Sequence, residues 1–207
     1  MKYHVCIIAL LFLFCTPLLA QYDEPAEDAA GTVSIGTRNT FSMFNDDPGI
    51  GVGIGGQTRV QVNDRINTEW FFDYITSRNK TITTRNDYHI GWSVMYYPGR
   101  NIDFTNLIQP YIVAGHCFDY SKIMEQKNKT NYADRWTMAT QAGLGTHINI
   151  SRVLDCSITG QYMLHFGKEI ETTIDKDLVV FEKQSFSTPD GHLLFSVSFN
   201  YKLFHLW

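Results

Sequence analysis

Apolar and polar residues alternate with a period of two along most of the chain after Gly31. Residues 192–207 show this clearly, because Ser196, Ser198, Asn200 and Lys202 share one face and nearly all the other face is apolar. Successive side chains of a β-strand point to opposite faces of a sheet, so this period predicts strands with one apolar face. No long run has the spacing of an amphipathic helix.

The same alternation predicts eight strands, each about ten or more residues long, which is the length that a tilted strand needs to cross a bilayer. An even number of strands lets both ends of the chain lie on one side. The predicted strands cover residues 32–41, 49–62, 66–74, 87–96, 107–120, 136–150, 154–165 and 192–207.

The links between these strands are expected to alternate in length. Residues 63–65 and 151–153 form tight turns, and residues 98–106 form a moderate one that opens with Pro98-Gly99. Longer polar links cover residues 42–47, 77–84, 121–134 and 166–191. All the long links would then emerge at one rim, as they do in transmembrane barrels.

The two faces differ in a way that indicates which one meets lipid. In the six clearest strands the apolar face carries no Asp, Glu, Lys or Arg, whereas the other face is rich in Gly, Ser, Thr and Gln. Small polar residues suit the narrow interior of an eight-stranded barrel, and aromatic residues suit the two water interfaces of a membrane. The predicted lipid-interface aromatics are Trp70, Tyr74, Trp92, Tyr96, Trp136, Tyr162 and Trp207.

The N-terminal residues have the layout of a secretory signal peptide. Lys2 precedes an apolar run from Val5 to Leu19, and cleavage is expected between Ala20 and Gln21. The predicted organisation is a signal peptide at 1–20, a flexible acidic tail at 21–31 and a barrel at 32–207. Of the four cysteines, Cys117 and Cys156 remain after cleavage, and we expect both to be free because they fall on non-adjacent strands.

Signal peptide, alternating strands, alternating links and a terminal strand that ends in Trp207 together resemble the small outer-membrane barrels of Gram-negative bacteria, the OmpA/OmpX-like group. The resemblance covers essentially the whole mature chain and implies an all-β, eight-stranded antiparallel up-and-down transmembrane β-barrel. The resemblance also implies a porin-like protein of the cell envelope that is a monomer in the lipid bilayer of the outer membrane. It implies that the barrel-assembly machinery inserts the protein after recognising its C-terminal strand. No peptidoglycan-binding domain is expected, so a wall-anchoring role is not implied.

Residues 49–65, GIGVGIGGQTRVQVNDR, contain the spacing G-x-G-x-x-G at Gly51, Gly53 and Gly56. A dinucleotide-binding motif needs a helix after its last glycine, and here a strand continues through it. We therefore predict that Gly49, Gly51, Gly53 and Gly55 face a crowded lumen and that Gly56 faces lipid.

Charged residues on the polar face are expected to pair inside the barrel, because an unpaired buried charge is costly. A three-residue turn at 63–65 places Arg59 opposite Glu69. The predicted lumen network comprises Arg38, Arg59, Glu69, Asp73, Asp119, Asp155 and Lys202. This network either closes the barrel as a plug or lines a small pore.

The remaining chemistry argues against several functions. The net charge of -4 gives no basis for binding nucleic acid. His147 is expected opposite Ser157, but no well-placed carboxylate completes a triad, so no enzyme is predicted. His89, His116, His147, His165 and His192 have no metal-ligand spacing, and no cofactor is expected.

A structural or surface-interaction role is the function that remains. The third and fourth long links either extend the strands as a hairpin rim or present an exposed β-edge to an extracellular partner. The alternative to this interpretation is a secreted, lipocalin-like barrel that holds an apolar ligand inside.

Overall fold

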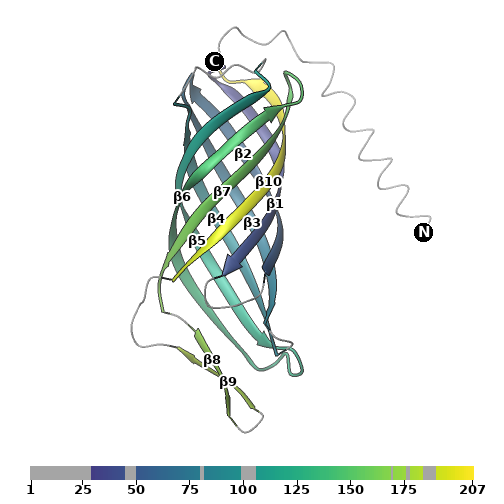
Figure 1. The fold of residues 1–207 in the computed structure, drawn as a ribbon, viewed down its shortest axis with the longest axis vertical. Helices are drawn as coiled ribbons and strands as arrows, with labels where there is room; N and C mark the ends of the chain where they lie inside the picture. The colour runs from purple at the N-terminus through teal and green to yellow at the C-terminus, as the bar shows by residue number, and fades with distance from the viewer. Residues whose placement is uncertain are drawn as a thin grey trace, which may run out of the picture.

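The computed structural model describes residues 29–44, 50–79, 82–98, 106–168, 170–175, 178–183 and 190–207. The predicted signal peptide and most of the predicted tail lie outside the described residues. Eight long strands close into an antiparallel barrel, and a separate two-stranded hairpin lies beyond one end of it (Figure 1). The barrel strands are β1 (Thr32–Phe44), β2 (Ile50–Asn63), β3 (Ile66–Asn79), β4 (Thr83–Tyr96), β5 (Ile108–Glu125), β6 (Tyr132–Asn149), β7 (Leu154–Phe166) and β10 (Asp190–His205).

Consecutive barrel strands are hydrogen-bonded neighbours, and β10 closes the ring by pairing with β1. The hairpin consists of β8 (Ile170–Asp175) and β9 (Leu178–Lys183), and it lies between β7 and β10 in the sequence. We call the end of the barrel where β1 begins and β10 ends the terminal end, and the opposite end the hairpin end. The eight-stranded all-β barrel predicted from the alternation is confirmed.

Among the described residues, no helix is long and apolar enough to cross a membrane.

The strands at the hairpin end are longer than predicted. β3, β4, β5 and β6 continue into the links expected at residues 77–84 and 121–134, so that only residues 80–82 and 126–131 separate them. Pairing continues because each hairpin satisfies the backbone groups of both its strands, even where the side chains are polar. The predicted strict alternation of link lengths is therefore wrong: the link at 97–107, at the terminal end, exceeds every link at the hairpin end except 167–189.

The last residues of the predicted flexible tail are fixed against the terminal end. Ala29 is buried in an apolar cluster with Met95, Tyr97, Tyr111 and Val113. The backbone of Gly31 donates to the carbonyl of Gln61 and accepts from Leu206. A short segment of small residues carries no periodic signal in the sequence, although its backbone finds partners on the barrel here.

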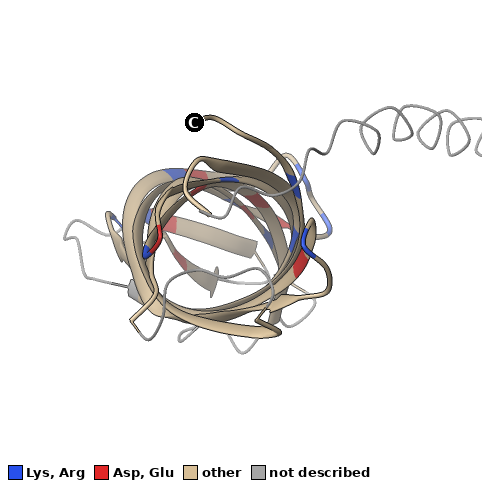
Figure 2. Ribbon diagram, turned by 90° about the horizontal axis from the view of Figure 1, so that it is seen from above, with Lys and Arg blue, Asp and Glu red and all other residues tan. Residues whose placement is uncertain are grey.

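The two faces of the barrel wall have opposite polarity. Side chains such as Ile54, Leu144 and Trp136 point outward and expose 64%, 67% and 72% of their surface, whereas the side chains inside are mostly polar and buried. An end view shows a closed ring with basic and acidic residues interspersed around its wall (Figure 2). The molecule therefore has its polar core inside and its apolar surface outside.

Candidate functional site

The lumen is the part of the molecule where reactive side chains gather. All seven residues of the predicted network face it, and none exposes more than 4% of its surface. Their ion pairs fall into three groups along the barrel axis, and Gln57 and Asn200 join the Arg38 group to the Arg59 group by hydrogen bonds. β7 contributes to successive levels in order, with Asp155 near the terminal end, then Met163, then His165 near the hairpin end.

The central group is an arginine held between two carboxylates. Arg38 on β1 donates Nη1 to Glu69 (2.8 Å) and Nε to Asp73 (2.9 Å), both on β3. Thr40 donates to the second oxygen of Asp73, and the Arg38 guanidinium lies 4.4 Å from the centre of the Phe71 ring. Because both carboxylates share one guanidinium, this group joins β1 to β3 across β2.

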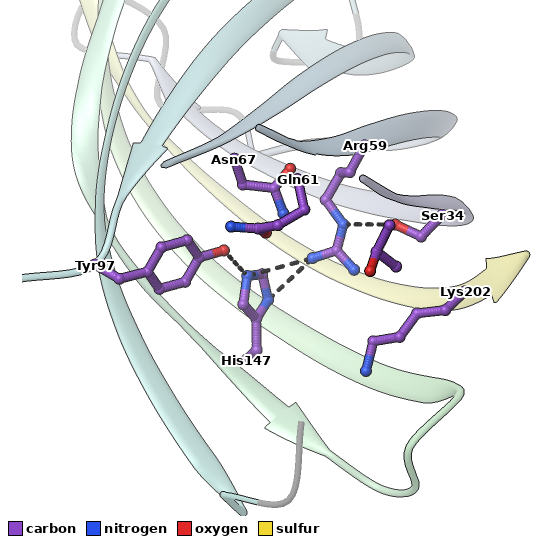
Figure 3. A pocket seen from close by; sticks show the side chains of 8 residues that line it. Ser34, Arg59, Gln61, Asn67, Tyr97, His147 and Lys202 are labelled. Carbon is purple, nitrogen blue, oxygen red and sulfur yellow. Dashed lines mark hydrogen bonds between the residues drawn. The ribbon is translucent and has the colours of Figure 1, made fainter. Parts of the chain in front are cut away.

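The second group lies at the terminal end and centres on Arg59 (Figure 3). Arg59 and Glu69 are cross-strand partners, as the turn at 63–65 predicts, but their ion pairs go elsewhere. Arg59 Nη2 donates to both oxygens of Asp155 at 2.9 and 2.7 Å, across the lumen on β7. Arg59 Nε also donates to Ser34. The length of a turn predicts which residues lie opposite each other on adjacent strands, but it does not predict contacts between strands on different sides of the lumen.

His147 is part of the Arg59 group but not of a catalytic triad. Ser157 Oγ and Asp155 Oδ1 lie 2.6 and 3.7 Å from the same ring nitrogen, Nδ1, while Tyr97 OH lies 2.7 Å from Nε2. A triad needs the hydroxyl and the carboxylate on opposite nitrogens. The carboxylate that the sequence did not reveal is thus present, but in a position that supports packing rather than nucleophilic attack.

Lys202 lines a small hollow at the terminal end with Arg59, His147 and Tyr97 (Figure 3). Its Nζ donates to Asn149 at 3.4 Å. The hollow measures about 20 Å³, which is room for about one water molecule.

The third group contains Asp119 and three histidines, which no sequence pattern brings together. His89 Nε2 lies 3.3 Å from Asp119 Oδ1, and His165 Nδ1 lies 3.1 Å from Asp119 Oδ2. His165 Nε2 in turn lies 3.2 Å from His192 Nδ1. We call these four residues the histidine cluster. His89 and Asp119 are cross-strand partners, so the register between β4 and β5, had it been known, would have revealed the pair.

An apolar layer packs beside the histidine cluster: on β7 its Met163 precedes His165, and on β3 its Phe71 and Ile75 flank Asp73, the cross-strand partner of His89. Its apolar side chains occupy sequence positions that the period-two pattern assigns to the polar, lumen-facing side of the strands. The pattern therefore did not distinguish them from the polar residues of the lumen. The residues of this layer are no more than 4% exposed and comprise Phe71, Ile75, Cys117, Ala139, Met163 and Leu194.

Cys117 and Cys156 are both free, as predicted, since β6 lies between their strands. In the described part of the chain, no group of three or more His, Cys, Asp or Glu side chains is arranged to hold a metal ion.

The glycines that raised the question of a phosphate site lie as their spacing suggests. A Cβ on Gly53 would approach Ile75 Cγ1 to 2.7 Å, and one on Gly55 would collide with Phe72 O and approach Asp73 Oδ1 to 2.6 Å. A Cβ on Gly56 would meet nothing closer than Gly36 O at 3.6 Å. Gly53 and Gly55 are therefore packed on the lumen side, whereas Gly56 has open space. Gly49 lies outside the described residues.

The outward aromatics lie at several levels. Tyr74, Tyr88, Tyr120 and Trp136 are successive cross-strand partners on β3 to β6, with ring centres 5.0, 5.9 and 4.9 Å apart. Trp70 and Trp92 pair with each other on the outer face, four residues along their strands from the pair of Tyr74 with Tyr88. The other predicted interface aromatics are also on the outer face: Tyr96, Tyr162 and Trp207 expose 42%, 45% and 67% of their surface.

Comparison with known proteins identifies the fold. No protein-family model matches the chain, and no curated protein does. Among solved structures, Neisserial surface protein A aligns with a TM-score of 0.54 and 13% identity, covering 83% of this chain and 96% of that one. A major outer membrane protein from Thermus thermophilus aligns with a TM-score of 0.56 and 9% identity, covering 82% of this chain and 99% of that one.

The chain therefore has the fold of the small eight-stranded outer-membrane barrels. At these identities the likeness establishes the architecture, and the function has to come from the residues themselves.

Proposed function

We propose that this protein is an integral outer-membrane barrel of a Gram-negative bacterium whose lumen is closed and whose hairpin end serves structure or surface interaction. The observation that carries the proposal is the inverted polarity of the wall, with large apolar side chains exposed outside and ion pairs buried inside. A lipid bilayer is the solvent that matches such a surface. A soluble, lipocalin-like barrel needs an apolar interior, and here Arg38, Arg59 and Asp155 occupy that space.

The packing of the lumen supports a closed barrel over a small pore. The apolar layer brings together side chains of β3, β5, β6, β7 and β10, and Arg59 on β2 reaches Asp155 on β7. A conducting path needs a continuous water column, and these side chains occupy the space that such a column would need.

The hairpin end supports the interaction role. β8 and β9 extend beyond the barrel, and Ile174 and Leu178 near their tip expose 60% and 69% of their surface. Asn131, in the β5–β6 turn, donates to the Val179 carbonyl at 2.8 Å and so ties this hairpin to the longest barrel strands. Two-stranded sheets keep unpaired edges, to which another chain can add a strand.

The proposal includes delivery by the barrel-assembly machinery, for which β10 would be the signal, and a monomeric state in the membrane. β10 is the strand that closes the ring against β1, and Phe204, Leu206 and Trp207 at its end remain exposed.

Planar-bilayer recordings test the closed lumen. Purified protein is expected to give no steady conductance, because ion passage would require breaking buried pairs. A stable single-channel current of the wild type would contradict closure and favour the small pore.

Deleting residues 170–183 tests the surface role. We expect the variant to keep the heat-modifiable migration of a folded barrel and to lose adhesion of the cells that carry it to other cells or coated surfaces. Glu171→Gln, which leaves the hairpin in place, is the matched control. Unchanged adhesion of the deletion variant would show that the hairpin binds no partner.

A further inference from the structure

The histidine cluster forms a single chain of polar contacts at the point where β7 and β10 leave the barrel wall. The order is His89, Asp119, His165 and His192, from β4, β5, β7 and β10, with successive contacts of 3.3, 3.1 and 3.2 Å. Each side chain is at most 1% exposed. β7 ends at Phe166 and β10 begins at Asp190, so the link that carries the β8–β9 hairpin starts and ends beside His165 and His192.

These contacts fix where the protons lie. A neutral imidazole has one N–H and one acceptor nitrogen. With Asp119 ionised, its negative charge favours a proton on His89 Nε2 and on His165 Nδ1, which lie 3.3 and 3.1 Å from its oxygens without making hydrogen bonds of good geometry. His165 Nε2 is then left as the acceptor for His192 Nδ1–H at 3.2 Å. This arrangement has three neutral imidazoles and one negative charge.

The cluster has room for one further proton but not for two or three. One proton offsets the charge of Asp119, and both ring nitrogens of His89 are buried atoms that make no hydrogen bond. Protonating both His165 and His192 places an N–H against an N–H at 3.2 Å. Their rings are stacked, with an interplanar angle of 21° and centres 4.9 Å apart, so two positive charges would face each other at close range.

The surrounding charges do not relieve this repulsion. His89 also interacts with Asp87 and Asp73, but Arg85 binds Asp87 at 2.9 Å and Arg38 binds Asp73 at 2.9 Å. Arg85 lies close enough to His192 to add to the positive charge there. β6 supplies the hydroxyl of Thr137, which donates to Asp119, and Arg135, which directs Nη1 to the Lys168 carbonyl. From β5, Cys117 belongs to the apolar layer beside the cluster.

We propose that the histidine cluster is an acid-sensitive latch that holds the hairpin ends of β7 and β10 together at neutral pH and releases them when His165 and His192 are both protonated. Protonation would therefore loosen the barrel wall where the link that carries β8 and β9 leaves β7 and rejoins β10. The latch follows from the lumen geometry alone and does not depend on the proposed surface role.

Proton linkage gives the direction of the effect. The opened state exposes both imidazoles to water and binds more protons than the closed state. The free energy of opening therefore falls as pH falls. Histidines that opening exposes to water take up protons as the pH falls below about 6.5, so opening becomes easier toward acid pH.

Hydrogen exchange of the protein in lipid vesicles tests the latch, after correction for the chemical exchange rate at each pH. Between about pH 7.5 and about pH 5, the amides of residues 163–166 and 191–194 are expected to exchange about tenfold faster. Amides of β1 and β2 near the terminal end should not change. His192→Gln removes one of the two facing charges and should abolish most of the acid increment, whatever its exchange rate at neutral pH.

His116→Gln is the matched control, because His116 lies on the outer face against Phe118 and outside the cluster. It should keep the full acid response. An acid increment in His192→Gln equal to that of the wild type would overturn the latch, as would the lack of any increment in the wild type.

If His192→Gln does not fold, imidazole nitrogen NMR of the wild type decides. His165 and His192 should take up their protons together with a change in nearby backbone shifts. Independent titration of the two rings, with no backbone change, would refute the proposal.

Discussion

At the scale of single residues, the lumen shows how a narrow barrel solves the problem of burying charge. A buried arginine that reaches across the lumen loses its hydrogen bonds to water and donates instead to two or more carboxylate oxygens, as Arg59 does to Asp155. Removing one partner of such a pair costs about 3–5 kcal/mol, so each pair also fixes which strands face one another. Glycines beside these groups leave room for them, because a larger side chain at the same position would collide with the paired residues.

Gly55 and Gly56 offer a matched test of which face is inside. Gly55→Ala is expected to lower the free energy of unfolding by about 1–3 kcal/mol, because its Cβ would collide with Phe72 O and with the Asp73 carboxylate that Arg38 holds. Gly56→Ala should instead raise it by about 0.5–1 kcal/mol, since alanine suits a strand better and the space is open. Urea unfolding in vesicles, followed by tryptophan fluorescence, measures both. Equal effects would contradict the assignment of the two faces.

The alternation of apolar and polar residues predicted which face of the wall each side chain lies on. It did not predict which side chains contact each other across the lumen. Period two places Arg38, Asp119 and Asp155 inside, because side-chain direction is a local property of a strand. It does not reveal that Asp119 meets His165 or that Arg59 meets Asp155, since those contacts depend on barrel closure and on the stagger between distant strands.

At the scale of elements, the strand ends at the hairpin end were the least predictable feature. Residues 121–125 and 132–135 have the pattern of a polar link, yet they continue β5 and β6. Above a membrane a strand no longer needs an apolar face, so the signal that marks it in sequence disappears while its backbone pairing persists. For the same reason, the sequence left open whether residues 170–183 form a hairpin.

The contact of Asn131 with the β8–β9 hairpin can be tested by proteolysis. Asn131 Nδ2 donates to the Val179 carbonyl at 2.8 Å and to Glu125 at 2.9 Å. Asn131→Ala should make cleavage within residues 170–183 about fivefold faster, the effect of losing about 1 kcal/mol of hydrogen bonding. Lys183→Ala is the control, because its 4.0 Å pair with Asp134 is largely exposed and contributes little. Similar rates for Asn131→Ala and the wild type would show that the hairpin is not tied there.

At the scale of the whole molecule, the barrel combines a polar interior with an apolar exterior, the reverse of a soluble domain. The fold was predictable because every strand carries the same alternation and because eight such strands close in one simple order. The filling of the lumen was not, since residues such as Met163 and Leu194 occupy polar-phase positions to form the apolar layer. That layer packs between parts of the histidine cluster and the ion pairs, while His89 and Asp73 remain cross-strand partners that couple the two.

The depth of the tryptophans in a bilayer tests the proposed membrane placement of the whole barrel. The chain has four tryptophans, so replacing three by Phe gives single-tryptophan variants that keep either Trp92 or Trp136. Trp136 belongs to the row of Tyr74, Tyr88 and Tyr120, and Trp92 pairs with Trp70 four residues farther from the hairpin end along β3 and β4. Given an apolar band about 25 Å tall, lipids brominated near the middle of the bilayer should quench Trp92 more strongly, and lipids brominated near the headgroups should quench Trp136. Equal quenching of both would mean that the barrel axis does not cross the membrane, and no quenching of either would mean that the apolar wall does not contact lipid.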